Sequence, residues 1–414
     1  MVRRVQNGLL HCLAIVALMV GLTSCNNNGP NPPEDEPEGV LDRTILVYQV
    51  ANNTGLDYFS LADLKEMLQG AENKLITNGR LVVYNHSYNH PPVLVRVTTH
   101  GLDTLKTYNT DITSVHAERM LQVFSDVERY APALDYGLIL WGHGSGWLQD
   151  GIADNVPSQR KSYGGEDRAK WMNITTLAQV LEQGPSFSFV YFDCCFMASV
   201  EVAYQLRHVT PMIAGTVSEL PAEGMPYHLT LGYLFSPDRA DLLGAIKTTF
   251  NYYDEWKVIG SRPEANPPTF DRRYCNMSVI STDGLDRLAE SVKQIYELTP
   301  KAYPDNFVPQ RFERRPLATA SYFDLGQYVE ALCVDEDGNE LFEGATAALD
   351  NFKKALDQTI AYQNTMPIIF GGDFTVDYHC GLSTYILRDA SSINNKNYNT
   401  LSWYEDVASY LNLN

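Results

Sequence analysis

Short, fully apolar runs alternate with segments of helical periodicity along the first half of the chain. The runs "LILW" at 138–141 and "FVYF" at 189–192 have no polar residue at alternate positions. Strands of this kind are buried on both faces, as in a parallel sheet that helices cover on each side. Strands that alternate with helices build such a sheet through β-α-β connections. We therefore predict an α/β fold with a mostly parallel central sheet and helices on both faces.

The same patterns place the individual elements. Predicted strands span 43–50, 79–88, 91–99, 136–141, 187–193 and 211–217, and predicted helices contain 61–68, begin at Ser114, and span 175–182 and 197–206. The prolines that open 91–99 favour an edge position for that strand. Beyond residue 227 the pattern is mixed α+β, with helices near 241–253, 284–297 and 342–363 and strands at 275–282 and 381–387.

The charge balance excludes one class of partner. The 414 residues are 44% hydrophobic and 20% charged, which is ordinary for a globular protein, and the formal net charge is −19. Nucleic-acid binding relies on Lys and Arg clusters that neutralise phosphates, and this composition argues against them. We therefore expect no nucleic-acid partner.

The N-terminus has the composition of an export signal. Arg3 and Arg4 precede an apolar stretch at 9–22, which is too short to span a bilayer comfortably. The tetrad Leu22–Cys25 resembles a bacterial lipobox, a signal whose cysteine is lipidated and becomes the first mature residue. We predict a lipoprotein signal peptide over residues 1–24.

The residues after the signal indicate a tether. Residues 25–41 are rich in Asn, Pro, Gly and acids, and cannot bury enough apolar surface to fold. We expect an exported protein that is anchored to a bacterial membrane, the outer one, through lipidated Cys25. An ordinary signal with an incidental cysteine is the alternative, and the sequence leaves open whether the protein faces the periplasm or the exterior.

The remaining cysteines do not form a recognisable framework. They are Cys194, Cys195, Cys275, Cys333 and Cys380. An odd, scattered set in an exported protein argues against a disulfide scaffold, and no C-x-x-C spacing indicates a metal site. A reactive thiol is the remaining role that such a set suggests.

Two motifs follow neighbouring apolar strands. "GHGSG" comes after "LILW" and contains His143, and "DCCFM" comes after "FVYF" and contains Cys195. Ligands of α/β sheets bind outside the carboxyl ends of the strands, where both motifs fall. A Cys–His pair is an established nucleophile and base, and a thiol at a helix N-terminus is more acidic. A structural histidine and a buried, inert cysteine are the alternatives.

Strand alternation separates the two adjacent cysteines. Asp193 and Cys195 are expected to point the same way, and Cys194 to point into the opposite packing layer. We therefore predict Cys195 as the nucleophile and Cys194 as a packing residue. Ser145 is a less suitable nucleophile because "GHGSG" does not match G-x-S-x-G in register. A hydrolase that uses Ser145 would retain activity without Cys195.

Several segments together resemble the clostripain-like cysteine peptidases, which share the caspase-type fold with caspases, legumains and gingipains. "TILVYQVANNTGLD", "YGLILWGHGSGW" and "FDCCFMASVEVAYQL" resemble the family's opening strand, histidine motif and cysteine motif, and "YFDLGQYVEAL" and "GLSTYIL" resemble later segments. The likeness runs from about residue 42 to the C-terminus. It implies a caspase-like sandwich with a catalytic core at 42–230 and a C-terminal helical and strand extension of the same unit at 231–414.

The resemblance also implies cleavage of peptide bonds after Arg or Lys, in protein or peptide substrates. Asp193 would pair with the basic side chain at the floor of a pocket, although it could instead cap the following turn. Glu219 would add negative charge. The backbone N–H groups of Gly144 and Cys195 would form the oxyanion hole. Departing from the family, Cys194 stands where a small residue such as alanine is usual.

Two further expectations come from the same resemblance. Arg160 and Lys161 lie in a polar segment between the two motifs, where the family is often activated by a cut, so we expect self-processing there. Calcium dependence occurs in the family, but "DEDGNE" at 335–340 lacks the glycine that an EF-hand needs, so no metal site is predicted. A surface lipoprotein that binds ligands on an inactive peptidase fold is the alternative function.

Overall fold

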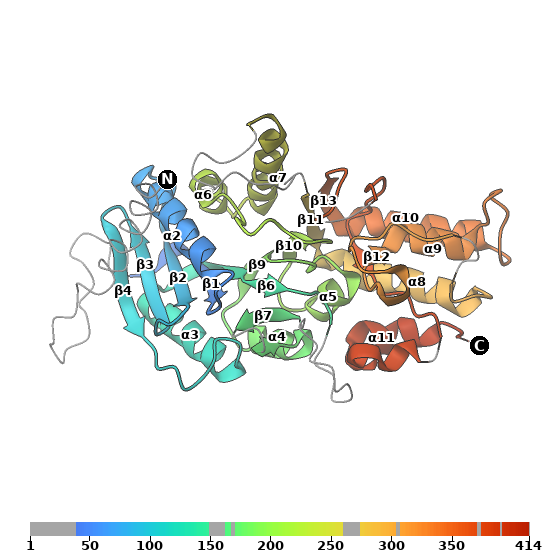
Figure 1. Ribbon diagram of the computed structural model, residues 1–414, viewed down its shortest axis with the longest axis horizontal. Coiled ribbons are helices and arrows are strands. Elements are labelled where there is room, and N and C mark those ends of the chain that lie inside the picture. Colours follow the sequence, from blue (N-terminus) through green and yellow to red (C-terminus); the bar gives the residue numbers. More distant parts are fainter. Residues whose placement is uncertain are drawn as a thin grey trace, which may run out of the picture. The chain divides into compact units, whose positions relative to one another are not determined.

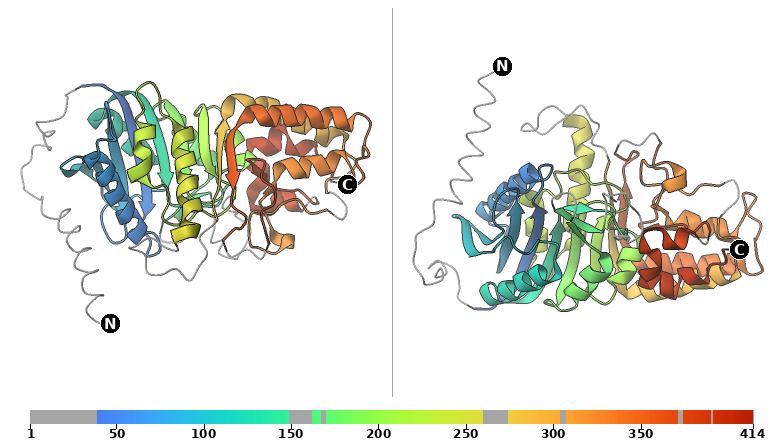
Figure 2. Two further views of the ribbon diagram at one scale, coloured as in Figure 1. Left: turned by 90° about the horizontal axis from the view of Figure 1, so that it is seen from above. Right: turned by 60° about the horizontal axis from the view of Figure 1, so that its bottom comes forward.

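A nine-stranded sheet forms the centre of the protein, and helices pack on both of its faces (Figure 1, Figure 2). The strand order is β13-β11-β10-β9-β5-β1-β2-β3-β4. The strands are β1 (Leu41–Ala51), β2 (Gly79–Ser87), β3 (Val93–Thr98), β4 (Gly101–Thr107), β5 (Ala133–Trp141), β9 (Phe187–Asp193), β10 (Met212–Thr216), β11 (Asn276–Ser281) and β13 (Ile360–Thr365). The computed structural model describes residues 39–148, 162–166, 170–259, 274–303, 307–370, 374–389 and 391–413.

The five central strands are parallel to one another. β2, β1, β5, β9 and β10 pair in parallel, whereas β3 and β4 at one end and β11 and β13 at the other join antiparallel. The parallel pairs include those that carry the two predicted motifs, because β5 pairs directly with β9. The predicted α/β class with a mostly parallel sheet is therefore confirmed.

The helices divide between the two faces of the sheet. One face is covered by α2 (Asp57–Glu72), α6 (Tyr227–Leu234) and α7 (Leu242–Ile259). The core on the other face contains residues of α3 (Ala117–Tyr130), α4 (Ile174–Leu181), α5 (Val200–Gln205), α8 (Leu285–Leu298), α9 (Leu325–Cys333), α10 (Ala345–Thr359) and α11 (Ser402–Asp406). Short elements complete the fold: β6 (His143–Gly144), β7 (Tyr163–Glu166), β8 (Lys170–Met172), β12 (Phe323–Asp324), β14 (Ser383–Thr384), and the 3-10 turns Thr282–Gly284, Leu317–Thr319, Ser392–Thr400 and Ala408–Tyr410.

Alternating side chains of the central strands supply two separate cores. Along β1, Leu46 and Tyr48 enter the core beneath α3 and α4, and Ile45 and Val47 enter the core beneath α2 and α6. All four are at most 1% exposed. Burial of each such side chain contributes about 1.5–3 kcal/mol, so the strands that carry the motifs are held firmly at the centre of the sheet.

Some predicted elements differ from the observed ones. β3 does not lie at the edge, because β4 pairs with its outer side. The prolines at 91–92 precede the strand, so they cost it no ladder hydrogen bond. The predicted helix at 342–363 ends at Thr359, where β13 begins, and the predicted strand at 381–387 contributes only the two residues of β14.

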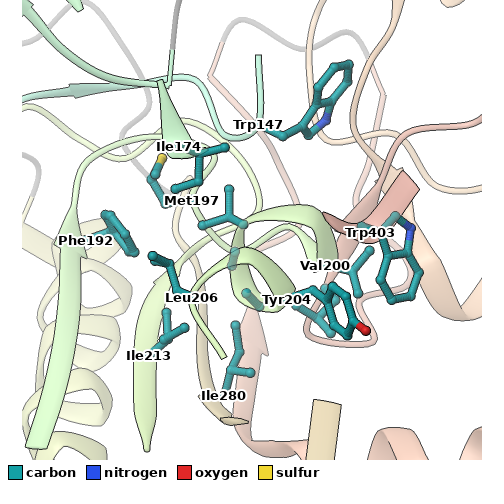
Figure 3. Packing of buried hydrophobic residues seen from close by; sticks show 14 of the residues in the cluster. Trp147, Ile174, Phe192, Met197, Val200, Tyr204, Leu206, Ile213, Ile280 and Trp403 are labelled. Carbon is teal, nitrogen blue, oxygen red and sulfur yellow. The ribbon is translucent and has the colours of Figure 1, made fainter. Parts of the chain in front are cut away.

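The C-terminal region packs directly on the part of the chain that carries the two predicted motifs. Figure 3 shows the indole of Trp403 beside α5, next to Val200 and Tyr204. The Tyr204 and Trp403 rings meet edge to face at 5.4 Å. The contacts join 39–414 into one unit, and the proposed division of the peptidase at residue 230 stays a prediction.

A buried carboxylate strengthens this junction. Glu201 of α5 is fully buried and accepts hydrogen bonds from the Thr384 hydroxyl at 3.0 Å, the Tyr385 N–H at 2.8 Å and the Tyr398 hydroxyl at 3.1 Å. Burial raises the pKa of Glu201, and the hydrogen bonds from Tyr385 and Thr384 oppose the shift.

Some predictions fall on residues outside the described ranges. These are the signal peptide at 1–24, the lipidated Cys25, and the processing residues Arg160 and Lys161. None of the helices that the structure describes combines the length and the apolar character needed to cross a bilayer.

Candidate active site

The loops that follow β5 and β9 meet at the carboxyl edge of the sheet. Trp141, the last residue of β5, pairs with Asp193, the last residue of β9. The loops therefore leave the sheet side by side. Together with the loop after β10, they line a pocket of about 230 Å³ that His143, Cys195 and Glu219 border.

Among the described residues, two larger pockets lie elsewhere and lack this chemistry. One of about 840 Å³ is lined by residues of α9 and the turn after it, including Glu330 and Asp335. Another pocket, of about 430 Å³, contains the ion pair of His86 and Glu166. Nδ1 of His86 lies 3.2 Å from Oε1 of Glu166. Neither is lined by a cysteine, so the smaller pocket at the sheet edge is the candidate active site.

The thiol of Cys195 lies half-buried against the loop after β10. The Leu220 N–H donates a hydrogen bond to the Cys195 sulfur at 3.3 Å, and the Leu220 carbonyl oxygen is 3.9 Å from the sulfur. An N–H donor stabilises the negative charge of a thiolate. Leu220 therefore fixes the direction of the thiol and favours its reactive form.

The predicted position of Cys195 at a helix N-terminus is wrong. α5 begins at Val200, and its N-cap is Ser199. The backbone of residues 196–198 is instead hydrogen-bonded to the end of β10 and the loop after it. The Phe196 N–H donates to the Ser218 carbonyl at 2.9 Å. Phe196 has a φ of 63°, a left-handed conformation that bends the chain sharply after Cys195.

Cys194 borders the same pocket, but its side chain is buried in the packing layer that strand alternation predicts. Its side chain is 2% exposed and packs in the core beneath α3, α4 and α5. Burial raises the pKa of the Cys194 thiol well above its ordinary value, and the neighbouring Cys195 and Asp193 raise it further. Cys194 is therefore a protonated packing residue at neutral pH.

A small three-stranded sheet supports His143. His143 lies in β6, which pairs with β7, and Gly164 of β7 is its partner. A Cβ atom at Gly165 would lie 2.8 Å from Cδ2 of His143, and Gly165 has a φ of 75°. Both observations require glycine at this position. The imidazole is thereby packed against the backbone of β7.

Gly144 lies against the backbone of Cys195. A Cβ atom at Gly144 would be 2.4 Å from the Cys195 carbonyl oxygen and 3.1 Å from the Cys195 nitrogen. Such an approach is possible only for glycine. The two residues expected to form the oxyanion hole are thus in close backbone contact.

Asp193 is the most enclosed polar group of the pocket. It is 3% exposed and accepts hydrogen bonds from the Tyr191 hydroxyl at 3.1 Å, the Met225 N–H at 3.1 Å and the Tyr227 hydroxyl at 3.0 Å. Burial raises the pKa of Asp193 to about 6, although these three donors oppose the shift. The carboxyl group is therefore mostly ionised at neutral pH and protonated in mild acid.

Gly224 covers the same carboxylate. A Cβ atom at Gly224 would lie 2.8 Å from Oδ2 of Asp193, and its φ is 59°. The Tyr253 hydroxyl donates to the Gly224 carbonyl. Glu219 lies half-buried on the wall of the pocket, so two carboxylates from different loops border the space beside Cys195.

The residues described by the structure include no group of three or more His, Cys, Asp or Glu that could hold a metal ion. They do not offer the carboxylate cluster that calcium prefers. The calcium dependence implied by the resemblance stays an expectation.

The sequence model of the clostripain family matches residues 47–412. The chain belongs to the clostripain family. This is a family of C11 cysteine peptidases, so the predicted resemblance is confirmed. The search among curated proteins found no match.

Two solved structures of clostripain-type C11 proteases are similar over most of the chain. One is an inactive zymogen C11 protease from Parabacteroides distasonis, 26% identical with a TM-score of 0.72, covering 89% of this chain and 99% of that one. The other is a secreted C11 cysteine protease from Bacteroides thetaiotaomicron in complex with an irreversible peptide inhibitor. It is also 26% identical with a TM-score of 0.72, covering 88% of this chain and 98% of that one.

Several residues of this clostripain-family site were not found from the sequence. Tyr191, Met225 and Tyr227 surround Asp193, and Leu220 contacts the thiol. Leu220 and Met225 act through backbone N–H groups, which no side-chain pattern reveals. Tyr191 was detectable in principle, because it lies two positions before Asp193 on the same strand face.

Proposed function

We propose that the protein is an exported, lipid-anchored cysteine endopeptidase that cleaves after Arg or Lys. The observation that carries this proposal is that His143, Cys195 and Asp193 border one pocket at the carboxyl edge of the sheet. A thiol, an imidazole and a buried carboxylate in one pocket supply a nucleophile, a base and a recognition group for a cation. Membership of a cysteine peptidase family supports the same conclusion.

The reaction follows from the residues present. His143 takes the proton from the Cys195 thiol, and the thiolate attacks the carbonyl carbon of the scissile bond. The N–H groups of Gly144 and Cys195 stabilise the resulting oxyanion. The intermediate collapses, the C–N bond breaks, and the amine leaves with the proton that His143 returns. Water, deprotonated by His143, then hydrolyses the thioester and releases the acid product.

Asp193 is the proposed partner of the substrate's basic side chain. A carboxylate offers about four acceptor positions, and three are taken by Tyr191, Met225 and Tyr227. The remaining capacity favours one charged hydrogen bond over a bidentate pair, and one such bond suits Lys as well as Arg. Glu219 adds a second negative charge at the same pocket.

Self-processing is part of the proposal. The similar protease from Parabacteroides distasonis is described as an inactive zymogen. Arg160 and Lys161 carry the side chains that the proposed pocket recognises, and they directly precede Ser162 and β7. A cut at these residues falls close in sequence to the strand that supports His143.

A test of the peptidase function uses an irreversible arginyl chloromethyl- or acyloxymethyl-ketone probe. Active enzyme alkylates Cys195, so the wild-type protein should gain the mass of the probe on that residue, and Cys195→Ala should not. A ligand-binding protein on an inactive fold would leave both unlabelled. The similar protease from Bacteroides thetaiotaomicron was solved with an irreversible peptide inhibitor, which makes this class of probe suitable.

The membrane anchor has a separate test. Lipidated Cys25 predicts that the protein fractionates with membranes and that Cys25→Ser is released in soluble form. Release of neither protein, or of both, would contradict anchoring through this residue without affecting the peptidase proposal.

A further inference from the structure

We propose that Tyr322 is a positioning residue that holds the Cys195 loop and the His143 loop in register. The proposal rests on the catalytic roles assigned above to Cys195 and His143. Tyr322 comes from the C-terminal half of the chain, immediately before β12, and contributes no group to the pocket that borders Cys195. Its effect on catalysis would be transmitted through the backbone of both loops.

The Tyr322 side chain contacts both loops at once. Its ring stacks on the Phe196 ring with centroids 4.4 Å apart and planes inclined by 15°. Its hydroxyl donates a hydrogen bond of 2.6 Å to the Ser145 carbonyl, 177 positions earlier in the chain. Phe196 follows the nucleophile directly, and Ser145 follows Gly144. The Tyr322 side chain therefore bridges Phe196, the residue after Cys195, and Ser145, which lies in the His143 loop.

Gly146, Phe196 and Tyr322 are packed tightly against one another. A Cβ atom at Gly146 would lie 2.7 Å from the Phe196 carbonyl oxygen and 2.9 Å from Cε1 of Tyr322. A shift of the tyrosine ring would therefore move the backbone of at least one loop. The fit also explains why glycine is required at position 146, where φ is 57°.

Phe196 makes this support necessary. Its left-handed φ of 63° is unfavourable for a residue with a side chain and persists only where the surroundings enforce it. Stacking on Tyr322 and the hydrogen bond of the Phe196 N–H to Ser218 are two such constraints. Loss of the first would let the chain after Cys195 relax and the thiol change direction.

Backbone hydrogen bonds to neighbouring residues of the C-terminal half hold Tyr322 in place. It is fully buried, its N–H donates to the Glu313 carboxylate at 3.2 Å, and its carbonyl accepts from the Phe312 N–H at 3.0 Å. Glu313 is 1% exposed and is paired with Arg315. The tyrosine is thus presented by a rigid segment, as a residue that sets the geometry of others must be.

The decisive comparison is Tyr322→Phe against Tyr328→Phe. Tyr328 is also fully buried in the C-terminal half, and its hydroxyl donates to a backbone carbonyl, that of Ala302, at 2.7 Å. Each change leaves a carbonyl without its donor, and Tyr328→Phe also removes the acceptor of the Tyr296 hydroxyl, so the control should lower the unfolding temperature at least as much. Only Tyr322→Phe should lower kcat, by about tenfold, with KM changed less than about twofold.

A second variant removes the ring as well as the hydroxyl. Tyr322→Leu should lower kcat further than Tyr322→Phe, because Phe restores the stacking on Phe196 and Leu does not. Circular dichroism and the unfolding temperature establish that each variant is folded. If Tyr322→Phe and Tyr328→Phe lower kcat equally, or not at all, Tyr322 is an ordinary core residue and the proposal is wrong.

A readout without substrate separates this proposal from the proposed peptidase function. The rate at which iodoacetamide alkylates Cys195, followed by mass spectrometry across the pH range, reports the environment of the thiol alone. Tyr322→Phe should change this pH profile, and Tyr328→Phe should match the wild type. Identical profiles for all three proteins overturn the positioning role, whereas a changed profile in a protein that cleaves no arginyl substrate overturns only the peptidase assignment.

Discussion

The Tyr227 hydroxyl donates a 3.0 Å hydrogen bond to Oδ2 of Asp193, an oxygen that also accepts from the Met225 N–H at 3.1 Å. Tyr227 begins α6, whereas Asp193 ends β9, so the floor of the pocket is assembled from two elements before any substrate binds. Burial raises the pKa of Asp193 to about 6, and the donors keep it from rising further. The carboxyl group of Asp193 therefore gains its negative charge as the pH rises through about that value.

Asp193→Asn should change the substrate preference and leave the folded structure largely intact. The Asn amide oxygen can accept from Met225 and Tyr227, and its NH₂ group can donate to the Tyr191 oxygen, so the network survives without the charge. The transition-state stabilisation that kcat/KM reports for arginyl substrates should fall by about 3–5 kcal/mol, because the substrate cation loses its buried partner. Unchanged arginyl kinetics would mean that Asp193 only caps the turn after β9.

The same variant should be stabilised at neutral pH relative to wild type. The folded pKa of Asp193, about 6, exceeds the ordinary value of 3.8, so proton binding favours the folded state. The resulting stability is complete below the unfolded pKa and is lost as pH rises through about 6. The free energy of unfolding of Asp193→Asn, relative to that of the wild type, should therefore be higher at about pH 8 than at about pH 4. Urea titrations at the two pH values measure it, and a constant difference would contradict the raised pKa.

The two adjacent cysteines should differ sharply in function. Cys195→Ala should abolish peptidase activity and keep the unfolding temperature, because its half-buried sulfur contributes little to either core. Cys194→Ala should keep most activity and lose on the order of 1 kcal/mol of stability, since it removes a buried sulfur from the core. Turnover of an arginyl fluorogenic substrate and thermal unfolding distinguish them. The reverse pattern would exclude Cys195 as the nucleophile.

Gly144→Ala should abolish activity through the backbone alone. The added Cβ would lie 2.4 Å from the Cys195 carbonyl oxygen, so one of the two loops must move. The matched control is Gly232→Ala in α6, where the Cβ would meet only Leu75, at an ordinary 3.5 Å. That change should preserve kcat and slightly raise stability, as alanine favours helix. Activity in Gly144→Ala comparable to the control would show that the loop accommodates the methyl group and that close contact is unnecessary.

Self-processing predicts a specific cut. Wild-type protein should resolve into two fragments on a denaturing gel, with a new N-terminus at Lys161 or Ser162, and Cys195→Ala should remain a single chain. Arg160→Ala with Lys161→Ala should also stay uncut. If the wild type is fully active while intact, the cut is not required, and the peptidase proposal is unaffected.

How far the sequence leads can be judged from particular residues. The runs before His143 and Asp193 were apolar at every position, and such runs identify buried parallel strands with little ambiguity. The start of α5 was misjudged because apolar residues at 196–198 fit a helix as well as an extended segment, and only the pairing with the loop after β10 decides between them. Tyr322 and Tyr227 could not be assigned, since their roles depend on contacts with distant residues that local periodicity does not encode.

The order of strands has a consequence for a nicked chain. A cut between 149 and 161 would leave β5-β1-β2-β3-β4 in one fragment and β13-β11-β10-β9 in the other, so the sheet would divide at a single seam, the β5–β9 ladder. Each fragment alone would present an interior strand as a bare, apolar edge, which invites aggregation. A nicked form should therefore be made most readily by folding first and cutting afterwards, and its two halves produced as separate polypeptides should recover activity only when they refold together.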